Sequence, residues 1–356
     1  MTHKNDVHLS ARASEARVWP KILGRFREPN ETRSVAEILV TALPLVALWC
    51  AMWFLVQQGF WWLSLLLAVP AAGFLVRLFL IQHDCSHGAF FRRRDVNDWV
   101  GRVLGVFTLT PHDYWRRSHA IHHATHGNLE QRGMGDITTL TVEEYRARGF
   151  WGRLGYRVYR SPVVLFVIGP AYLFLLQHRL PIGMMRGGGS QPWLSTMGTN
   201  LGIALVAGGL MWLVGVGPFL MVHLPIAIIA ASIGVWLFYV QHQFEETFWA
   251  RPPEWTHQEA ALHGSSYYDL PGVLRWMSAN IGVHHVHHLC SRIPFYRLPE
   301  VLKQHPELMQ VGRITIGESL RTVPLVLWDE GRQQLVPFKA MKRWEAVSLP
   351  LAAEPA

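Results

Sequence analysis

Histidines gather in three short clusters of this chain, and their spacing is that of metal ligands on helices. The clusters read His83-Asp84-Cys85-Ser86-His87, His119-Ala120-Ile121-His122-His123 and His284-His285-Val286-His287-His288. Residues three and four apart lie on one face of an α-helix, so each cluster can aim two or three imidazoles at a common point. Imidazole binds iron, zinc, copper and nickel. Three such helices that converge would hold more than one transition-metal ion.

The rest of the chain is apolar for its length. Half of its 356 residues are hydrophobic, only 16% are charged, and it contains 16 Trp and 17 Phe. This composition is typical of a membrane protein. The net charge of +8 indicates contact with a membrane surface rather than a nucleic acid, because Lys and Arg flank the apolar runs. The three cysteines have no C-x-x-C spacing, so neither an iron–sulfur cluster nor a disulfide framework is expected.

Four apolar stretches are long enough to cross a bilayer, which takes about 20 residues. They pair as two hairpins, 36–57 with 60–82 and 199–216 with 219–241. Shorter apolar stretches at 99–111 and 162–177 suit re-entrant or interfacial placement. Thr141-Val142-Glu143-Glu144 has the spacing of a capping box, and it precedes a basic, aromatic segment that we expect to lie at the interface.

The predicted fold is therefore an all-α integral membrane protein. It has four transmembrane helices in two hairpins, re-entrant or interfacial helices, and a cytoplasmic cap that carries a histidine-rich dimetal site. Residues 1–35 are predicted to be a basic cytoplasmic tail, 36–316 the membrane domain, and 317–356 a cytoplasmic tail.

A shared metal site constrains which side of the membrane the clusters occupy. Two clusters follow the first hairpin and the third follows the second, so an even number of crossings must separate them, and four spans satisfy this. Both hairpin turns lack Lys and Arg, whereas the N-terminal tail and the Arg92–Arg94 and Arg116–Arg117 runs lie at the other ends of the spans. The positive-inside rule then places all three clusters in the cytoplasm.

Eight histidines fit the spacing, which is too many for one tetrahedral zinc site and suits two ions with about four imidazoles each. They are His83, His87, His119, His122, His123, His284, His287 and His288. His242, at the end of the last span, is either a ninth ligand or a polar cap where the helix leaves the lipid. His285 falls outside the register, and the surface or hydrogen-bonding histidines are expected to be His112, His126, His257, His263 and His305.

Metal-bound imidazoles usually donate their other N–H group to a carboxylate or a carbonyl. The candidate carboxylates near the clusters in sequence are Asp84, Asp136, Glu245 and Asp269. Asn280 lies four residues before His284 on a predicted helix, so it could face the site directly or through water. For each of these residues, a role as a helix cap or a solvated side chain is the alternative.

With these clusters the chain resembles the membrane fatty-acid desaturase family. The three boxes of that family, H-x(3,4)-H, H-x-x-H-H and H/Q-x-x-H-H, match HDCSH, HAIHH and HHVHH in the same order. The resemblance covers about residues 36 to 310. The segment GSSYYDLPGVLRWMSANIGVHHVHHLCSRIPFY is also similar to the bacterial acyl-lipid branch that acts toward the methyl end, of Δ12 or omega-6 type.

The resemblance implies an O2-dependent oxidoreductase that introduces a cis double bond into a membrane acyl chain. It implies two iron ions held by the eight histidines, with His242 as a candidate ninth ligand; spacing alone would allow zinc or manganese. The expected partners are an acyl-lipid or acyl-thioester substrate and an electron donor such as ferredoxin, and no nucleic acid. The acyl chain would lie in an apolar tunnel among the spans, and the protein in a bacterial inner membrane.

Two other functions remain open at this point. Hydroxylases, ketolases and conjugases share the same boxes, so the boxes do not separate desaturation from oxygen insertion. A metal transporter is the alternative outside the enzymes, but it predicts ligands near the bilayer midplane, whereas these clusters follow the predicted spans.

Overall fold

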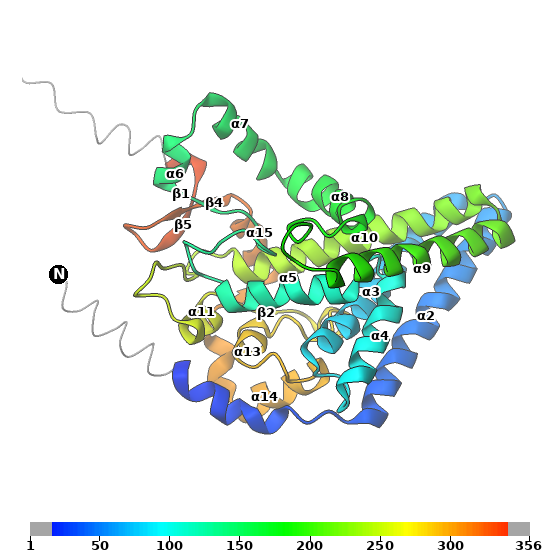
Figure 1. The fold of residues 1–356 in the computed structure, drawn as a ribbon, viewed down its shortest axis with the longest axis horizontal. Helices are drawn as coiled ribbons and strands as arrows, with labels where there is room; N and C mark the ends of the chain where they lie inside the picture. Colours follow the sequence, from blue (N-terminus) through cyan, green and yellow to red (C-terminus); the bar gives the residue numbers. More distant parts are fainter. Residues whose placement is uncertain (1–15, 341–356) are drawn as a thin grey trace, which may run out of the picture.

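Four long helices dominate the structure, a computed structural model that describes residues 16–340. They are α2 (Glu31–Gln57), α3 (Trp61–His87), α9 (Gln191–Val214) and α10 (Val216–His242). Each is long and apolar enough to cross a membrane, and together they form two hairpins that extend to the right in Figure 1. The hairpins turn at Gly59 and Gly215, both with positive φ. The four predicted spans are confirmed.

Helix α3 is longer than the apolar pattern indicated. It continues through the first histidine cluster to His87 and ends at Gly88, a left-handed residue (φ 64°) whose N–H bonds back to the carbonyls of Asp84 and Cys85. The apolar run stops at residue 82, but nothing before Gly88 breaks the helix. The first cluster therefore forms the last turns of a spanning helix instead of following it.

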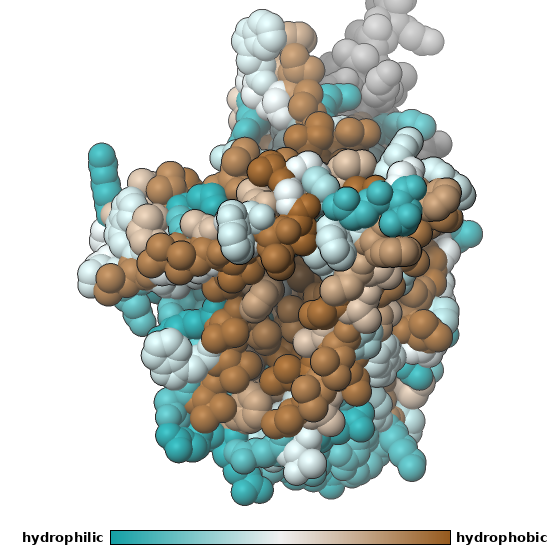
Figure 2. Space-filling model, turned by 90° about the vertical axis from the view of Figure 1, so that its right-hand side faces the viewer, coloured by the Kyte–Doolittle hydropathy of each residue, from teal (hydrophilic) through white to brown (hydrophobic). Residues whose placement is uncertain are grey.

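The outer faces of the hairpins carry large apolar side chains. Leu43 is 63% exposed on α2, and Leu205 and Trp212 are 68% and 88% exposed on α9. Figure 2 shows the end of the molecule at which the hairpins lie, with apolar side chains over most of the face and around a recess. Faces of this extent are too apolar for water and suit contact with lipid.

Helices α4 (Arg94–Phe107) and α5 (His112–Thr125) form a shorter hairpin that packs between α3 and α9. A Cβ atom at Gly202 of α9 would lie only 2.7 Å from Val106 Cγ2, so the glycine lets α4 approach closely. The hairpin turns over residues 108–111, within the stretch that was expected to be re-entrant or interfacial. Its second helix carries the middle histidine cluster.

A second shorter arm follows. The predicted capping box is confirmed, since the Thr141 hydroxyl and the Glu144 carboxylate each accept the other residue's N–H at the start of α6 (Val142–Ala147). Helix α7 (Phe150–Tyr159) exposes Phe150 and Trp151. It bends by 59° into the segment that contains η2 (Val164–Ile168), α8 (Gly169–Leu175) and η3 (Gln177–Arg179).

The cap beyond α10 consists of short elements. In chain order they are α11 (His257–His263), β2 (Tyr267–Asp269), α12 (Gly272–Met277), α13 (His284–Leu289), η4 (Phe295–Arg297), α14 (Leu298–Gln304), η5 (Pro306–Gln310), β3 (Arg313–Thr315), α15 (Ile316–Thr322), β4 (Leu325–Asp329) and β5 (Gln334–Pro337). At the other end of the chain, η1 (Gly24–Phe26) precedes α2.

Two small sheets join distant segments of the chain. β2 pairs with β3 in parallel, and β4 pairs in parallel with β1 (Leu140–Thr141) and antiparallel with β5. The sheets are minor additions to a predominantly helical molecule. Residues 317–340 are thus folded against the segment around β1, while residues 1–15 and 341–356 of the two predicted tails lie outside the described residues.

Candidate metal centre

Nine histidines from four helices meet at one end of the spans. The last turns of α3 supply two of them, α5 and α13 supply three each, and the final residue of α10 supplies His242. Their ring nitrogens divide into two groups, and within each group all these nitrogens lie within 4.8 Å of one another. The three clusters, which are about 30 to 160 positions apart in sequence, therefore share one site.

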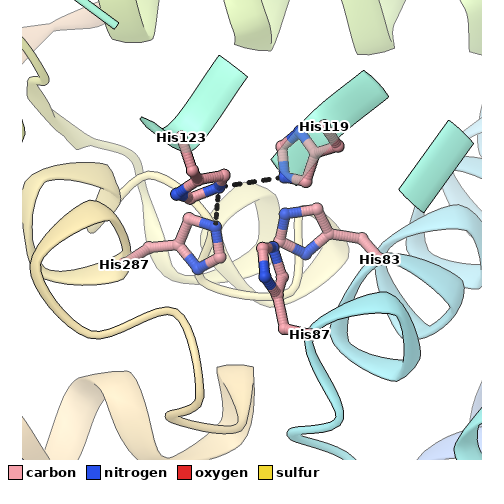
Figure 3. Close-up of side chains that lie close together, drawn as sticks. All are labelled: His83, His87, His119, His123 and His287. Carbon is pink, nitrogen blue, oxygen red and sulfur yellow. Dashed lines mark hydrogen bonds between the residues drawn. The ribbon is translucent and has the colours of Figure 1, made fainter. Parts of the chain in front are cut away.

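The first group has five members and is drawn in Figure 3. They are His83, His87, His119, His123 and His287. The Nε2 atom of His123 lies 3.0 Å from Nε2 of His119 and 3.2 Å from Nε2 of His287. All five imidazoles point toward a common space between α3, α5 and α13.

The second group has four members, all of them buried: His122, His242, His284 and His288. The Nε2 atom of His284 lies 3.0 Å from that of His242 and 3.1 Å from that of His288. The two groups adjoin, since the rings of His123 and His288 stack with their centroids 4.1 Å apart.

The donor atoms of both groups fit a bound transition metal. Nε2 of His87 and Nε2 of His122, one from each group, are buried and have no hydrogen-bond partner among the described residues. Two nitrogen ligands at right angles on a metal with bonds of about 2.1 Å lie about 3 Å apart, which is the separation of the facing Nε2 atoms. An imidazole nitrogen buried against other imidazole nitrogens loses its water without gaining a proton donor, and a cation supplies the missing partner.

The protonation states agree with this fit. Burial lowers the pKa of His119 and His123 well below the usual value, and neighbouring imidazoles lower it further. The same two causes lower the pKa of the three clustered histidines on α13, His284, His287 and His288. These imidazoles are neutral at ordinary pH, which is the state that binds metals.

A buried carboxylate orients one member of the second group. Asp136 Oδ1 lies 2.5 Å from His122 Nδ1. Burial alone would raise the pKa of Asp136, but the facing His122 outweighs it and the pKa is lowered, so the carboxylate stays charged. The Asp136 carboxylate accepts a hydrogen bond from the protonated Nδ1 atom of His122. The Nε2 atom of the same ring then directs its lone pair into the four-histidine group. Gly135 (φ +78°) permits the approach, because a Cβ atom there would lie 3.2 Å from His122 Cβ.

Comparison with known proteins decides the family. Residues 60–318 match the fatty acid desaturase family model. The chain is 42% identical to a fatty acid desaturase of Bacillus subtilis (strain 168), over 93% of this chain and 92% of that protein. The chain belongs to the fatty acid desaturase family. It is 28% identical to the sn-1 oleoyl-lipid 12-desaturase of Synechocystis, over 63% of each chain, and 27% identical to that organism's sn-1 acyl-lipid omega-3 desaturase (ferredoxin), over 62% of this chain and 61% of that one.

Membership of the family settles the broad class of this protein. It is an oxidoreductase, and its four apolar helices make it an integral membrane protein. Fatty acid desaturases generally use iron and O2, and the two histidine groups supply the nitrogen ligands for a metal. The metal-transporter interpretation is therefore wrong. His83 and His87 lie in the last turns of α3 and not near its middle.

The other three predicted carboxylates, Asp84, Glu245 and Asp269, do not all lie near the histidines. Asp84 is buried beside His83, with 3.3 Å between Oδ1 and Nδ1, and its Oδ2 atom accepts the N–H of Phe295. Glu245 follows the end of α10 and is exposed. Asp269 pairs with Arg313 at the surface of the cap. The structure brings Asp84 and Asp136 to the histidines and leaves Glu245 and Asp269 away from them.

The prediction that Asn280 lies on the helix of the third cluster is wrong. Asn280 has φ 54° and sits in the turn before α13. Asparagine tolerates this left-handed conformation better than most residues, so the chain turns there and the helix begins only at His284. The Asn280 amide donates to the Phe295 carbonyl at 3.2 Å instead of facing the groups.

His126, which the sequence predicts to be a surface or hydrogen-bonding histidine, is buried and hydrogen-bonded beside the four-histidine group. Its ring centroid lies 4.2 Å from that of His242, and with His122 and Asp136 it forms a third set of potential ligands. Its Nε2 atom donates to the Gly264 carbonyl at 2.8 Å. It is the C-cap residue of α5, four positions after His122. His285 is buried on another side of α13, 6.2 Å from the Tyr267 ring, and is in neither group.

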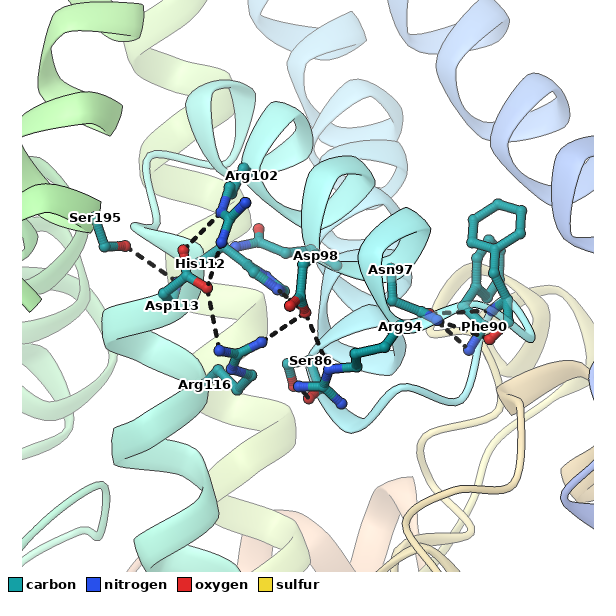
Figure 4. Close-up of polar contacts among 12 residues, drawn as sticks. Ser86, Phe90, Arg94, Asn97, Asp98, Arg102, His112, Asp113, Arg116 and Ser195 are labelled. Carbon is teal, nitrogen blue, oxygen red and sulfur yellow. Dashed lines mark hydrogen bonds and ion pairs between the residues drawn. The ribbon is translucent and has the colours of Figure 1, made fainter. Parts of the chain in front are cut away.

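A polar network fixes the beginning of α5 and so the direction of its three histidines (Figure 4). Asp113 accepts from Arg102 at 2.8 Å, and its own N–H donates to Ser195 of α9 at 3.1 Å. Arg116 binds Asp98 of α4 at 2.6 Å. His112 is fully buried against Gly101, where a Cβ atom would lie 2.2 Å from the ring. These contacts anchor α5 to α4 and α9.

Proposed function

We propose that this protein introduces a cis double bond into the acyl chain of a membrane lipid, at a Δ12 or omega-6 type position, with two iron ions held by the nine histidines. The observation that carries the proposal is the division of those histidines into a group of five and a group of four. Each group has the number of nitrogen donors that one ion needs, and the groups adjoin.

The residues of the site set the orientation and the charge of the imidazole ligands, and their burial excludes water from the ligand atoms. Imidazole ligands carry no negative charge, so they would leave bound metals more positive than a carboxylate-rich site would. Asp136 keeps a proton on His122 Nδ1, and Asp84 lies against His83 and fixes the loop at Phe295. When bound, iron in such a site supplies the oxidising power, with O2, that removal of hydrogen from an unactivated methylene requires.

The relatives support the substrate class, the position of the double bond and the electron donor. The Synechocystis relatives are named as desaturases that act on acyl lipids, one at position 12 and another as using ferredoxin. We extend to this chain an acyl-lipid substrate and a ferredoxin-like donor. An acyl-thioester substrate is the other form that the family accepts.

The charge pattern supports an inner-membrane location with the metals toward the cytoplasm. The tight turns of both hairpins carry neither Lys nor Arg, whereas Arg94, Arg102 and Arg116 surround the base of α4 and α5. By the positive-inside rule the histidine groups face the cytoplasm.

Expression in a host with a defined lipid composition, followed by mass spectrometry of the fatty-acid methyl esters, tests this function. The expected product is an acyl chain that has lost two hydrogens, with the new double bond nearer the methyl end. His122→Ala and His287→Ala, one from each group, are expected to abolish it. A product that gains one oxygen instead would contradict desaturation, and product formation by both variants would contradict the shared site.

A further inference from the structure

A buried arginine lies outside the three histidine clusters, next to segments that serve the four-histidine group. Arg160 is the C-cap residue of α7, at the bend that leads into η2, and only 3% of it is exposed. Burying a guanidinium removes its charge from water at a large cost in free energy, which fixed hydrogen-bond partners must offset. The partners of Arg160 therefore indicate what the buried charge is used for.

The guanidinium of Arg160 binds three separate segments of the chain. One terminal nitrogen lies 3.2 Å from the carbonyl oxygen of Thr138 and 3.4 Å from the hydroxyl of Thr139. The other lies 3.1 Å from Gln243 Oε1 and 2.9 Å from the carbonyl oxygen of Leu325. All four acceptors are neutral. The remaining donor, Nε, is buried and has no hydrogen-bond partner among the described residues.

The first of these segments ends at His242. Gln243 directly follows this histidine as the C-cap residue of α10, and its N–H donates to the Tyr239 carbonyl at 2.8 Å. The Gln243 side chain is buried and held twice, because its Oε1 atom also accepts from the Thr139 hydroxyl at 3.3 Å. The end of α10 is therefore fixed one residue from an imidazole of the four-histidine group.

The second segment carries Asp136, the carboxylate that orients His122. Thr138 lies two positions after Asp136, and its N–H donates to the Tyr159 hydroxyl at 3.0 Å. Because the Thr138 carbonyl accepts from Arg160, both backbone polar groups of Thr138 are held by the end of α7. The loop that presents Asp136 thus depends on the same guanidinium as the end of α10.

The third segment follows α15 near the end of the described chain. Leu325 begins β4, which pairs in parallel with β1. The Tyr239 ring lies 5.8 Å from the Arg160 guanidinium, and the Tyr239 hydroxyl donates to the Thr322 carbonyl at 2.9 Å. Arg160 therefore joins α7, the Asp136 loop, the end of α10 and the start of β4 at one point.

We propose that Arg160 is a positioning residue for the four-histidine group, which sets the direction of His242 and, through Asp136, that of His122. The inference rests on the two-ion site of the proposed function. Arginine suits this role because its planar guanidinium presents donors in fixed directions, so two segments can be held at once. His242 and His122 both belong to the four-histidine group, so the five-histidine group should not depend on Arg160.

Arg160→Gln tests the inference, with Arg157→Gln as its matched control. Arg157 lies three residues earlier on α7 and is exposed, and it donates to the Tyr145 hydroxyl at 2.7 Å and lies over the Phe338 ring. Both changes therefore remove one positive charge from the end of the same helix. The purified full-length proteins are loaded with iron-57, and their Mössbauer spectra and iron content are compared at increasing concentrations of free iron.

Arg160→Gln is expected to change the Mössbauer signal of one iron and to leave the other as it is. The binding of one ion is expected to weaken by about 10–100-fold, the range typical of residues that orient metal ligands. Arg157→Gln is expected to match the wild-type protein in both measurements. Arg160→Lys keeps the charge but not the planar fork of donors, so it is expected to change the same iron signal by a smaller amount.

A purely structural role for Arg160 predicts a different result. A general loosening of the fold would change both iron signals alike, and that outcome, or no change in either signal, would overturn the positioning role. If Arg160→Gln does not fold, Arg160→Lys decides. A change confined to one iron signal supports the inference, whereas equal changes or none overturn it.

Failure of the inference and failure of the proposed function are distinguishable. The Mössbauer comparison does not require turnover, so it tests Arg160 even if the acyl product is not the expected one. Unchanged iron signals in Arg160→Gln and Arg160→Lys, with normal desaturation, would overturn only the role of Arg160. A wild-type protein that binds iron but forms no desaturated product would overturn the proposed function instead.

Discussion

The two histidine groups draw on the same three clusters, yet they are supported differently. In the five-histidine group His87 and His123 are only partly buried, whereas all four members of the other group are buried. Each group has a buried carboxylate beside one ring, Asp84 at 3.3 Å from His83 Nδ1 and Asp136 at 2.5 Å from His122 Nδ1, but only the four-histidine group has His126 packed against a member, His242. Adjoining sites with similar donors therefore need not be equally accessible to solvent.

Removing one ligand from each group is the strongest test of the division. His83→Ala and His284→Ala each delete an imidazole from one group only, and the loss of a direct ligand exceeds the 10–100-fold typical of an outer partner. Desaturation is expected to fall at least about a hundredfold in both. Iron content, measured by elemental analysis of the purified protein, is expected to drop by about one ion per chain in each variant; loss of both ions from either would show that the groups are not separate.

Asp136→Asn is expected to lower the metal affinity of the four-histidine group and to leave that of the five-histidine group unchanged. The amide cannot hold the His122 proton as a carboxylate does, so metal affinity or activity is expected to fall by about 10–100-fold. Asp269→Asn is the control, because Asp269 pairs with Arg313 away from the histidines. Mössbauer spectra of the iron-57 protein would show whether one iron environment changes and the other does not. Equal changes in both would mean that Asp136 does not distinguish the groups.

Chelation should reveal the difference in burial. A hydrophilic chelator reaches partly buried imidazoles sooner than buried ones, so iron is expected to leave in two phases, about half of it in the faster one. The dye-complexed iron is followed by absorbance on the detergent-solubilised protein, and desaturation of a remetallated sample checks that the protein stayed folded. A single phase would contradict the assigned difference in access.

His126→Gln tests whether His126 is a metal ligand of the four-histidine group. Of these variants it is expected to change activity least. The Nε2 atom of His126 already donates to the Gly264 carbonyl, so its loss removes one neutral hydrogen bond, worth about 1 kcal/mol. Activity is expected to fall only a few-fold and iron content to stay the same. If His126→Gln loses an ion per chain, His126 belongs with the ligands.

Features that depend on residues close together in the chain could be predicted from the sequence. The spans follow from runs of apolar residues, and the candidate ligands His119, His122 and His123 from their spacing on one helix. The prediction for Asn280 was wrong because a turn residue was treated as helical. The partners of His126 could not be predicted, because only the tertiary fold brings Gly264 and His242 near it.

The presence of two separate iron sites can be tested by anomalous diffraction at the iron absorption edge, on crystals of the purified protein. We expect two iron peaks per chain, one within reach of the five-histidine group and one within reach of His122, His242, His284 and His288. A single peak, or two peaks that both lie among the same histidines, would contradict it.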